Sequence, residues 1–304
     1  MTIKKKYFSS AKSAFAFLEL LASDDHNFIF RGHSNESYLL DTTYKRHTTR
    51  PIEGDGAEDL KMMIEAFRGG LAKLGLNPIP GSSNQDWLEY GRHHALPTPA
   101  LDFSYSPYVA LFFAFDGKKR DLKIAKRKPR KDKYVAIYAV NINTLASCWA
   151  TNNREPGSNE WYKARNDFLL LSPKFFENGF PGMTLKFFPA PSRHNHRMQR
   201  QMGCLLYDTV DFKRIGFENL DEFIDKYDEP RTSGKYGVPE PTAFKILIAR
   251  NCVPEVLAKL ELMNIGGGAL YMDADGVARD VINMYSYTPK TSLVLGVELD
   301  SSSS

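Results

Sequence analysis

The sequence has few cysteines and no long apolar run, and both absences restrict the class of protein. Cys148, Cys204 and Cys252 are far apart and without CxxC spacing, which is typical of a reduced, cytosolic protein. No apolar run reaches the length of about eighteen residues that indicates a membrane helix, so we predict no membrane partner. Lys12 and Glu19 interrupt the apolar segment near the N-terminus, which argues against a secretory signal.

The sequence also lacks the standard signatures of several enzyme classes. It contains no GxSxG, no P-loop and no HExxH. We find no internal repeat and no long linker, and 42% of the residues are hydrophobic and 25% charged, as in an ordinary globular protein. We therefore expect one α+β domain over residues 1–300, followed by a tail without order at 301–304.

One short segment carries the whole basic excess of the chain. Between Lys118 and Lys133 stand ten Lys and Arg against two Asp, whereas the whole chain has a net charge of +4. The segment is either a solvated inserted loop or an arm that contacts nucleic-acid phosphates. It has no interleaved aromatic residue, so such an arm would position a nucleic acid without stacking on its bases. The candidate contacts are Lys126, Arg127, Lys128, Arg130 and Lys131, extended by Arg197 and Arg200.

The stretch from Phe28 to His33 is the centre of our interpretation. Three apolar residues with strand propensity run directly into Arg31, Gly32 and His33. This pattern predicts a buried strand that brings one fixed cation to the rim of a cleft, where the glycine lets a ligand approach the backbone. The alternative is an arginine that pairs with a carboxylate of the core.

Periodicity and capping signals predict elements on both sides of this strand. Ser106 and Pro107 are a typical helix start, and the helix over 107–115 is apolar on all sides, so we expect it to be buried. Its positive end, beside Asp102 and Ser104, suits an anionic ligand. We expect Asp86 to cap a short helix, with Glu89 completing a capping box. Further helices are predicted at 9–24, 57–76, 160–171 and 254–265, and strands at 134–140, 184–188, 204–208, 244–249 and 292–297.

Several of these segments resemble one known family. Phe30-Arg31-Gly32 resembles the motif that gives the FRG domain family its name. His93, Leu96-Pro97-Thr98 and Leu101-Asp102-Phe103-Ser104 resemble the family's QHYGLPTRLLDWT block. Residues 107–115 resemble its LVALYFA continuation, and 197–205 its R-x-x-x-Q-x-G-x-F block. The main departures from the pattern are Arg92 for Gln, His94 for Tyr, Ala95 for Gly and Pro99 for Arg.

The FRG pattern in turn resembles the arginine class of ADP-ribosyltransferases. This resemblance implies a split antiparallel β core with surrounding helices, NAD as co-substrate and no metal. In that superfamily an Arg-Gly on the first core strand holds NAD. A second strand brings Ser or an aromatic residue, and a third usually brings a glutamate.

Carried over to this sequence, the resemblance implies catalytic roles for Arg31, Asp102 and Gln201. Gln201 stands where glutamate is expected and supplies no charge, so Asp102 becomes the candidate for the missing carboxylate. The implied NAD-binding residues are Arg31, Gly32, His33, His93, Thr98, Ser104 and Tyr105.

The resulting prediction is an ADP-ribosyltransferase-like toxin of phage defence that modifies a macromolecule. The basic segment indicates RNA as the acceptor, and an antitoxin protein is an expected partner. Three alternatives remain open. An NAD glycohydrolase would use water as the acceptor, and a non-catalytic module would only hold a nucleotide or RNA. A metal-dependent nuclease would use histidines such as His194 and His196.

Overall fold

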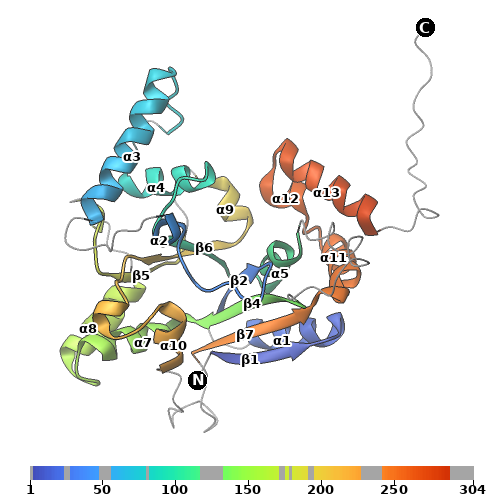
Figure 1. Cartoon of the computed structure of the whole chain (residues 1–304), viewed down its shortest axis with the longest axis horizontal. Coiled ribbons are helices and arrows are strands. Elements are labelled where there is room, and N and C mark those ends of the chain that lie inside the picture. The colour runs from blue at the N-terminus through green and yellow to red at the C-terminus, as the bar shows by residue number, and fades with distance from the viewer. Residues whose placement is uncertain are drawn as a thin grey trace.

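The computed structural model describes residues 3–23, 28–47, 56–79, 82–116, 133–170, 175–177, 180–190, 195–226 and 242–287. A seven-stranded sheet in the order β1-β7-β4-β2-β3-β6-β5 forms its centre (Figure 1). Only β1 and β7 pair in parallel, and the other neighbours are antiparallel. The strands are β1 (Lys4–Phe8), β2 (Phe28–His33), β3 (Ala100–Ser104), β4 (Tyr134–Asn141), β5 (Leu185–Phe188), β6 (Gly203–Asp208) and β7 (Ala243–Ala249).

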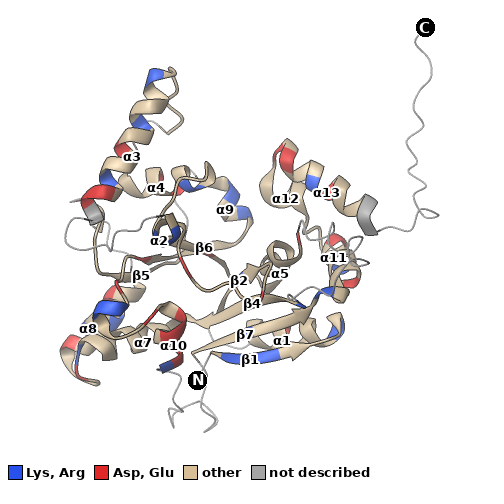
Figure 2. Cartoon of the chain, viewed as in Figure 1, with Lys and Arg blue, Asp and Glu red and all other residues tan. Residues whose placement is uncertain are grey.

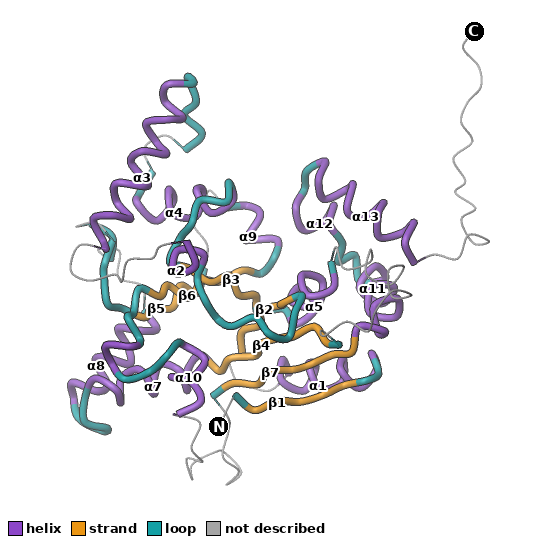
Figure 3. Tube along the Cα trace, viewed as in Figure 1, coloured by secondary structure: helices purple, strands orange, loops and turns teal. Residues whose placement is uncertain are grey.

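Helices surround this sheet, so the predicted α+β class is confirmed (Figure 3). The first group is α1 (Ala11–Ser23), α2 (Thr43–His47), α3 (Gly56–Lys73), α4 (Asn84–His93), α5 (Pro107–Phe115) and α7 (Ile142–Asn153). The second is α8 (Asn159–Leu169), α9 (His196–Arg200), α10 (Leu220–Lys226), α11 (Val253–Leu262), α12 (Gly267–Tyr271) and α13 (Ala274–Tyr287). In the part of the chain that the structure covers, no helix has the length and apolar composition needed to span a membrane.

The sheet is nearly divided between β2 and β3. These strands share one registered pair, Phe30 with Ser104. By contrast, β2 pairs with β4 along its whole length, and β3 does so with β6. The sheet therefore consists of a β1-β7-β4-β2 half and a β3-β6-β5 half that meet along a short seam.

The two faces of the sheet are covered differently. On one face, α7, α8 and α10 join a single cluster that runs under both halves and includes Ile29 of β2 and Phe103 of β3. On the other face, α1, α5 and α11 pack over the first half around Phe30. A separate cluster from α3 and α4 packs over the second half around Tyr207. On this face, the seam between β2 and β3 thus lies between two clusters.

Local capping explains where α5 and α4 begin. As predicted, Ser106 caps α5 and its side chain accepts a hydrogen bond from Val109 N, with Pro107 in the first turn. The predicted cap of α4 is wrong. Ser83, not Asp86, is the N-cap, and the Asp86 carboxylate accepts from Ser83 N at 2.8 Å. Glu89, which we expected in the box, is instead buried and accepts from Asn195 Nδ2 at 2.7 Å.

The remaining strand and helix predictions differ mainly at their ends, and some elements were not anticipated. The helices expected at 9–24, 57–76, 160–171 and 254–265 correspond to α1, α3, α8 and α11, which are shorter. No local signal predicted β1, which is an exposed edge strand, or α7, which begins directly after β4. The strand expected at 292–297, the tail at 301–304 and the basic segment up to residue 132 lie outside the described residues.

Candidate functional site

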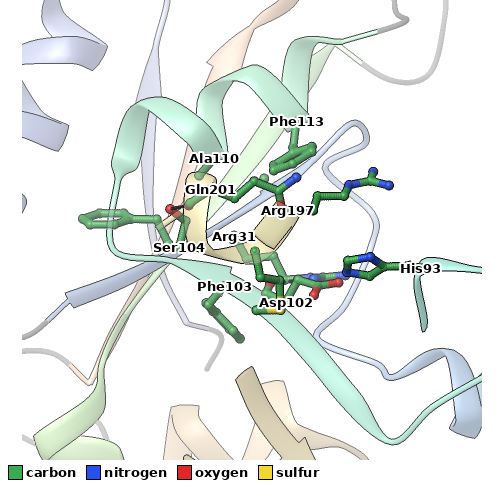
Figure 4. Close-up of a pocket in the computed structure, with 12 residues that line it drawn as sticks. Arg31, His93, Asp102, Phe103, Ser104, Ala110, Phe113, Arg197 and Gln201 are labelled. Carbon is green, nitrogen blue, oxygen red and sulfur yellow. Dashed lines mark hydrogen bonds between the residues drawn. The ribbon is translucent and has the colours of Figure 1, made fainter. Parts of the chain in front are cut away.

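A pocket of about 330 Å³ opens at the seam between β2 and β3 (Figure 4). Strand residues form one side, and they include Arg31 and Gly32 of β2 and Asp102 and Ser104 of β3. Residues from helices or their ends complete the wall: His93, Phe113, Arg197 and Gln201. Figure 4 shows Asp102 and His93 across the pocket from Phe113 and Arg197. The predicted catalytic residues Arg31, Asp102 and Gln201 are therefore brought together in one cavity.

Arg31 is a mostly buried cation at the end of the buried run of β2. Its Nη1 donates to the main-chain oxygen of Asp102 at 2.6 Å, and its Nε donates to His33 Nε2 at 2.9 Å. Burial, followed by the charge of Arg46, lowers the pKa of Arg31 to about 10. Neither partner is a carboxylate group, and no described acidic side chain forms an ion pair with Arg31. The alternative of an arginine paired with a core carboxylate thus does not describe this residue.

His33 lies behind Arg31 and does not line the pocket. Because the Arg31 Nε–H donates to it, Nε2 of His33 must be the unprotonated nitrogen of the ring. Burial first, and the charge of Arg31 second, lower the pKa of His33 to about 2. His33 therefore remains neutral at physiological pH and fixes the orientation of Arg31, which differs from the direct NAD contact predicted from the resemblance.

Asp102 connects two arginines. Its main-chain oxygen accepts from Arg31, and its Oδ1 forms an ion pair with Nη2 of Arg92 on α4. Arg92 also donates from Nη1 to the main-chain oxygen of Ala100 at 2.7 Å. The Asp102 side chain stays 55% exposed, whereas that of Arg92 is 9% exposed. The strand side of the pocket therefore carries the Asp102 carboxylate, which is accessible to a ligand and is held in place by Arg92.

Gly32 is required by packing against α5. A Cβ atom at this position would lie 2.0 Å from the main-chain oxygen of Ala110 and 2.8 Å from the main-chain nitrogen of Ala114. Both neighbours are backbone atoms of a buried helix, so neither can move aside alone. The glycine thus lets a helix approach the strand, in addition to any approach of a ligand from the pocket.

Ser104 and Gln201 are linked on the far side of the seam. The Ser104 hydroxyl donates to the main-chain oxygen of Gln201 at 2.7 Å and accepts from Ser106 N at 2.9 Å. The Gln201 side chain donates from Nε2 to the main-chain oxygen of Leu270 at 3.3 Å. These contacts tie β3, the end of α9 and α12 together around the pocket.

The cationic character of the pocket continues on its helix side. The guanidinium of Arg197 lies 4.1 Å from the ring centroid of Tyr271, a cation–π contact. Phe113 meets Tyr271 edge-to-face at 6.1 Å. Burial lowers the pKa of His93 to about 4, with Arg197 and Arg92 as further causes, so this ring is neutral at pH 7. Figure 2 shows basic residues on α9, the helix that carries Arg197.

Other predicted site residues lie away from the pocket. Thr98 is fully buried. Its main-chain N–H donates to the Thr43 hydroxyl, and its main-chain oxygen accepts from the same hydroxyl. The Tyr105 hydroxyl donates to the main-chain oxygen of Pro189 at 2.9 Å. Arg200 is exposed on α9 and does not line the cavity. Lys126, Arg127, Lys128, Arg130 and Lys131 lie outside the described residues, as does His194.

The sequence analysis did not assign a role to Phe113, which lines the pocket, or to Arg92, which lies behind it. Phe113 belongs to a helix that is apolar on all sides, so its composition gave no sign that one ring faces a cavity. Arg92 was noted only as a departure from the family pattern, and its contact with Asp102 depends on how α4 lies over β3. Within the ranges described above, no cluster of His, Cys, Asp and Glu has the arrangement of a metal site.

Comparison with known proteins agrees with part of this interpretation. The model of the FRG domain family matches residues 26–123, which include β2, α4, β3 and α5. No curated protein and no solved structure matches the chain. The matched segment supplies Arg31, Arg92 and Asp102, while Arg197 and Gln201 come from later in the chain. Residues 26–123 are therefore similar to the FRG domain family, and this matched segment forms the strand side of the pocket.

Proposed function

We propose that this protein transfers ADP-ribose from NAD to a macromolecular acceptor. The observation that carries the proposal is the charge of Arg31, which lies in the pocket without a described carboxylate partner. A buried cation without a counter-ion is costly, and a bound anion would remove that cost. A planar guanidinium suits the oxygens of a diphosphate, to which it can donate in pairs.

The surroundings of Arg31 support a dinucleotide more than a simple anion. The pocket has anion-binding groups on two sides, Arg31 on β2 and Arg197 on α9. Phe113 offers an aromatic surface, and Ser104 and Gln201 add polar groups to the lining. A ligand with phosphates, sugar hydroxyls and a planar ring would use all of these contacts. The volume of about 330 Å³ is at the low end for small-molecule sites, so part of a dinucleotide would extend outside.

The proposed reaction breaks the bond between C1′ of the ribose and the nicotinamide nitrogen. Nicotinamide leaves with the bonding electron pair, and C1′ passes through an oxocarbenium-like state. A nucleophile of the acceptor then bonds to C1′ and releases its proton to water. Asp102, with its exposed carboxylate, is the acidic group of the pocket that could stabilise the positive charge at C1′. Gln201 would hydrogen-bond a ribose hydroxyl.

RNA remains the proposed acceptor. This part of the proposal rests on the basic composition of residues 118–133 and on the position of Arg197 at the pocket. Lys and Arg that contact phosphates give affinity without sequence specificity, so salt would weaken the reaction with RNA. Modification of cellular RNA would be consistent with a toxin.

A second candidate function is binding without catalysis. One observation favours it: the carboxylate of Asp102 is already paired with Arg92, and Gln201 supplies no charge. A site of this kind would hold a nucleotide through Arg31 and Arg197 and release no nicotinamide.

The test is incubation of the whole protein with NAD labelled in its ADP-ribose part, together with total cell RNA, DNA and protein. We expect label in one macromolecular fraction and an equal amount of free nicotinamide. Free ADP-ribose alone would indicate a glycohydrolase. NAD binding without nicotinamide release would select the binding module and refute the proposed transfer.

Two arginine variants give the matched comparison. Arg31→Ala should lower the rate about 100-fold or more, because it removes a group that stabilises the bound phosphates. Arg154→Ala removes an exposed arginine after α7, far from the pocket in sequence, and should change nothing. Full activity in Arg31→Ala would contradict the proposed site.

A further inference from the structure

Arg92 occupies an unusual position behind the pocket. It lies in the last turn of α4 and does not line the cavity, yet its guanidinium reaches two residues of β3 that point to the same face. Nη1 donates to the Ala100 main chain, and Nη2 pairs with Asp102 Oδ1. Since Ala100 and Asp102 are alternate residues of one strand, the planar guanidinium fixes the Asp102 side chain relative to its own backbone.

This arrangement is unfavourable for Arg92 itself. Its side chain is 9% exposed, and the buried Nε–H has no acceptor among the described residues. Burial, with the nearby charge of Arg31 as the second cause, lowers the pKa of Arg92 to about 10, and Glu89 opposes this shift. A neutral side chain could bond to Ala100 without these costs. A structural tie between α4 and β3 therefore does not explain why a charged group is placed here.

The position of Asp102 supplies a reason. An aspartate that is 55% exposed at a pocket wall would ordinarily sample several rotamers. Arg92 contacts Oδ1 and leaves Oδ2 without a hydrogen-bond partner in the described part of the chain. The main-chain oxygen of Asp102 also accepts a hydrogen bond from Nη1 of Arg31 at 2.6 Å. Asp102 thus presents a fixed carboxylate oxygen to the cavity, and its main chain fixes the guanidinium of Arg31 beside the same cavity.

We infer that Arg92 is a positioning residue that holds the Asp102 carboxylate toward the ligand's ribose while Arg31 holds its phosphates. Arg92 acts only through Asp102 and does not contact the ligand. This inference rests on the proposed function and adds to it the residue that sets the geometry of the acidic group.

The test uses steady-state kinetics of nicotinamide release. Arg92→Gln and Asp102→Asn should each lower kcat on the order of tenfold to a hundredfold, since misplacing a reacting group by about 1 Å has effects of this size. KM for NAD should stay within about threefold, because Arg31 still binds the phosphates. The double variant should be no slower than the slower single variant, because both changes remove one interaction. Arg92→Lys, which keeps the charge, should recover part of kcat.

Arg250→Gln is the control. Arg250 is also a partly buried arginine, and its Nη2 donates to the main-chain oxygen of Ser34 at 3.0 Å, outside the pocket lining. Its loss should lower the melting temperature without changing kcat. If Arg92 were only structural, Arg92→Gln would behave in the same way. The inference would be overturned if folded Arg92→Gln kept the wild-type kcat. It would also be overturned if the effects of the two changes on kcat multiplied in the double variant. If Arg92→Gln fails to fold, Arg92→Lys decides. Wild-type values of both kcat and KM in that variant would refute the inference.

Failure of the proposed function gives a different result. If the wild type releases no nicotinamide, that function is refuted, and calorimetric binding of ADP-ribose to the same variants decides the role of Arg92. Equal losses of affinity in Arg92→Gln and Asp102→Asn support it. A loss in Asp102→Asn alone, or no binding by the wild type, refutes it.

Discussion

Gly32→Ala should lower the unfolding free energy far more than the addition of one methyl group usually does. The new Cβ would lie 2.0 Å from Ala110 O and 2.8 Å from Ala114 N, and contacts below about 3 Å require something to shift. Both atoms belong to the backbone of α5, which is held by the cluster around Phe30. The whole helix would have to move away from β2.

The expected loss in unfolding free energy is about 3 kcal/mol, the upper part of the range for overpacking, because no flexible side chain can absorb the contact. Urea denaturation followed by circular dichroism measures it. Gly69→Ala is the matched control, since nothing lies within 4 Å of a Cβ at this site in α3. That change should stabilise the protein by about 0.5–1 kcal/mol, because alanine is the better helix former.

Nicotinamide release gives a second measurement on the same variants. Phe113 and Ala110 reach the pocket from α5, so a displaced helix should also lower the activity of Gly32→Ala. Wild-type stability in Gly32→Ala would show that α5 does not pack on β2 as described. A loss of activity at full stability would instead indicate that the glycine serves the ligand.

Three further outcomes follow from the buried polar groups. Arg31→Met should leave the unfolding free energy unchanged or raise it by about 1 kcal/mol, because it removes a buried cation without a described counter-ion; a loss above about 2 kcal/mol in urea denaturation would give Arg31 a structural role. Burial lowers the pKa of His33 to about 2 and that of His93 to about 4, so both rings stay neutral when the unfolded chain takes up protons below about pH 6.5. Stability should therefore be complete above that pH and fall by up to about 1.4 kcal/mol per pH unit for each ring as the pH drops toward 4; NMR titration midpoints near 6.5 in the folded protein would contradict this. Tyr138→Phe should cost about 1–3 kcal/mol in the same denaturation assay, because Asp221 Oδ1 loses a 2.6 Å donor inside the protein. An unchanged midpoint would show that this carboxylate is hydrated.

The elements with a strong local signal were predictable from the sequence. The apolar run of β2 and the start of α5 at Ser106 and Pro107 are set by residues that are adjacent in the chain. Strand β1 was not, because Lys4–Lys6 is exposed and becomes a strand only through pairing with β7, more than two hundred residues away. Helix α7 was missed because Asn141 ends β4 and caps the helix at once, with no turn residue between them.

The site was predictable to a similar degree. The resemblance placed Arg31, Asp102 and Gln201 in one site, and the structure brings these three residues to one pocket. The contact of Arg92 with Asp102 depends on how α4 lies over β3, which no local pattern encodes. The exposure of Phe113 depends on the separation of two core clusters, which is equally non-local. The relation to ADP-ribosyltransferases and the identity of the acceptor stay predictions.

The short seam in the sheet has a consequence for how such proteins can diversify. Only the pair Phe30 and Ser104 has to keep its register for the two halves to remain joined. Substitutions that tilt one half against the other would disturb few ladder hydrogen bonds, because each half retains its own pairing. The width of the cavity could then change during evolution without rebuilding either half, and related chains could accommodate ligands of different sizes on the same framework.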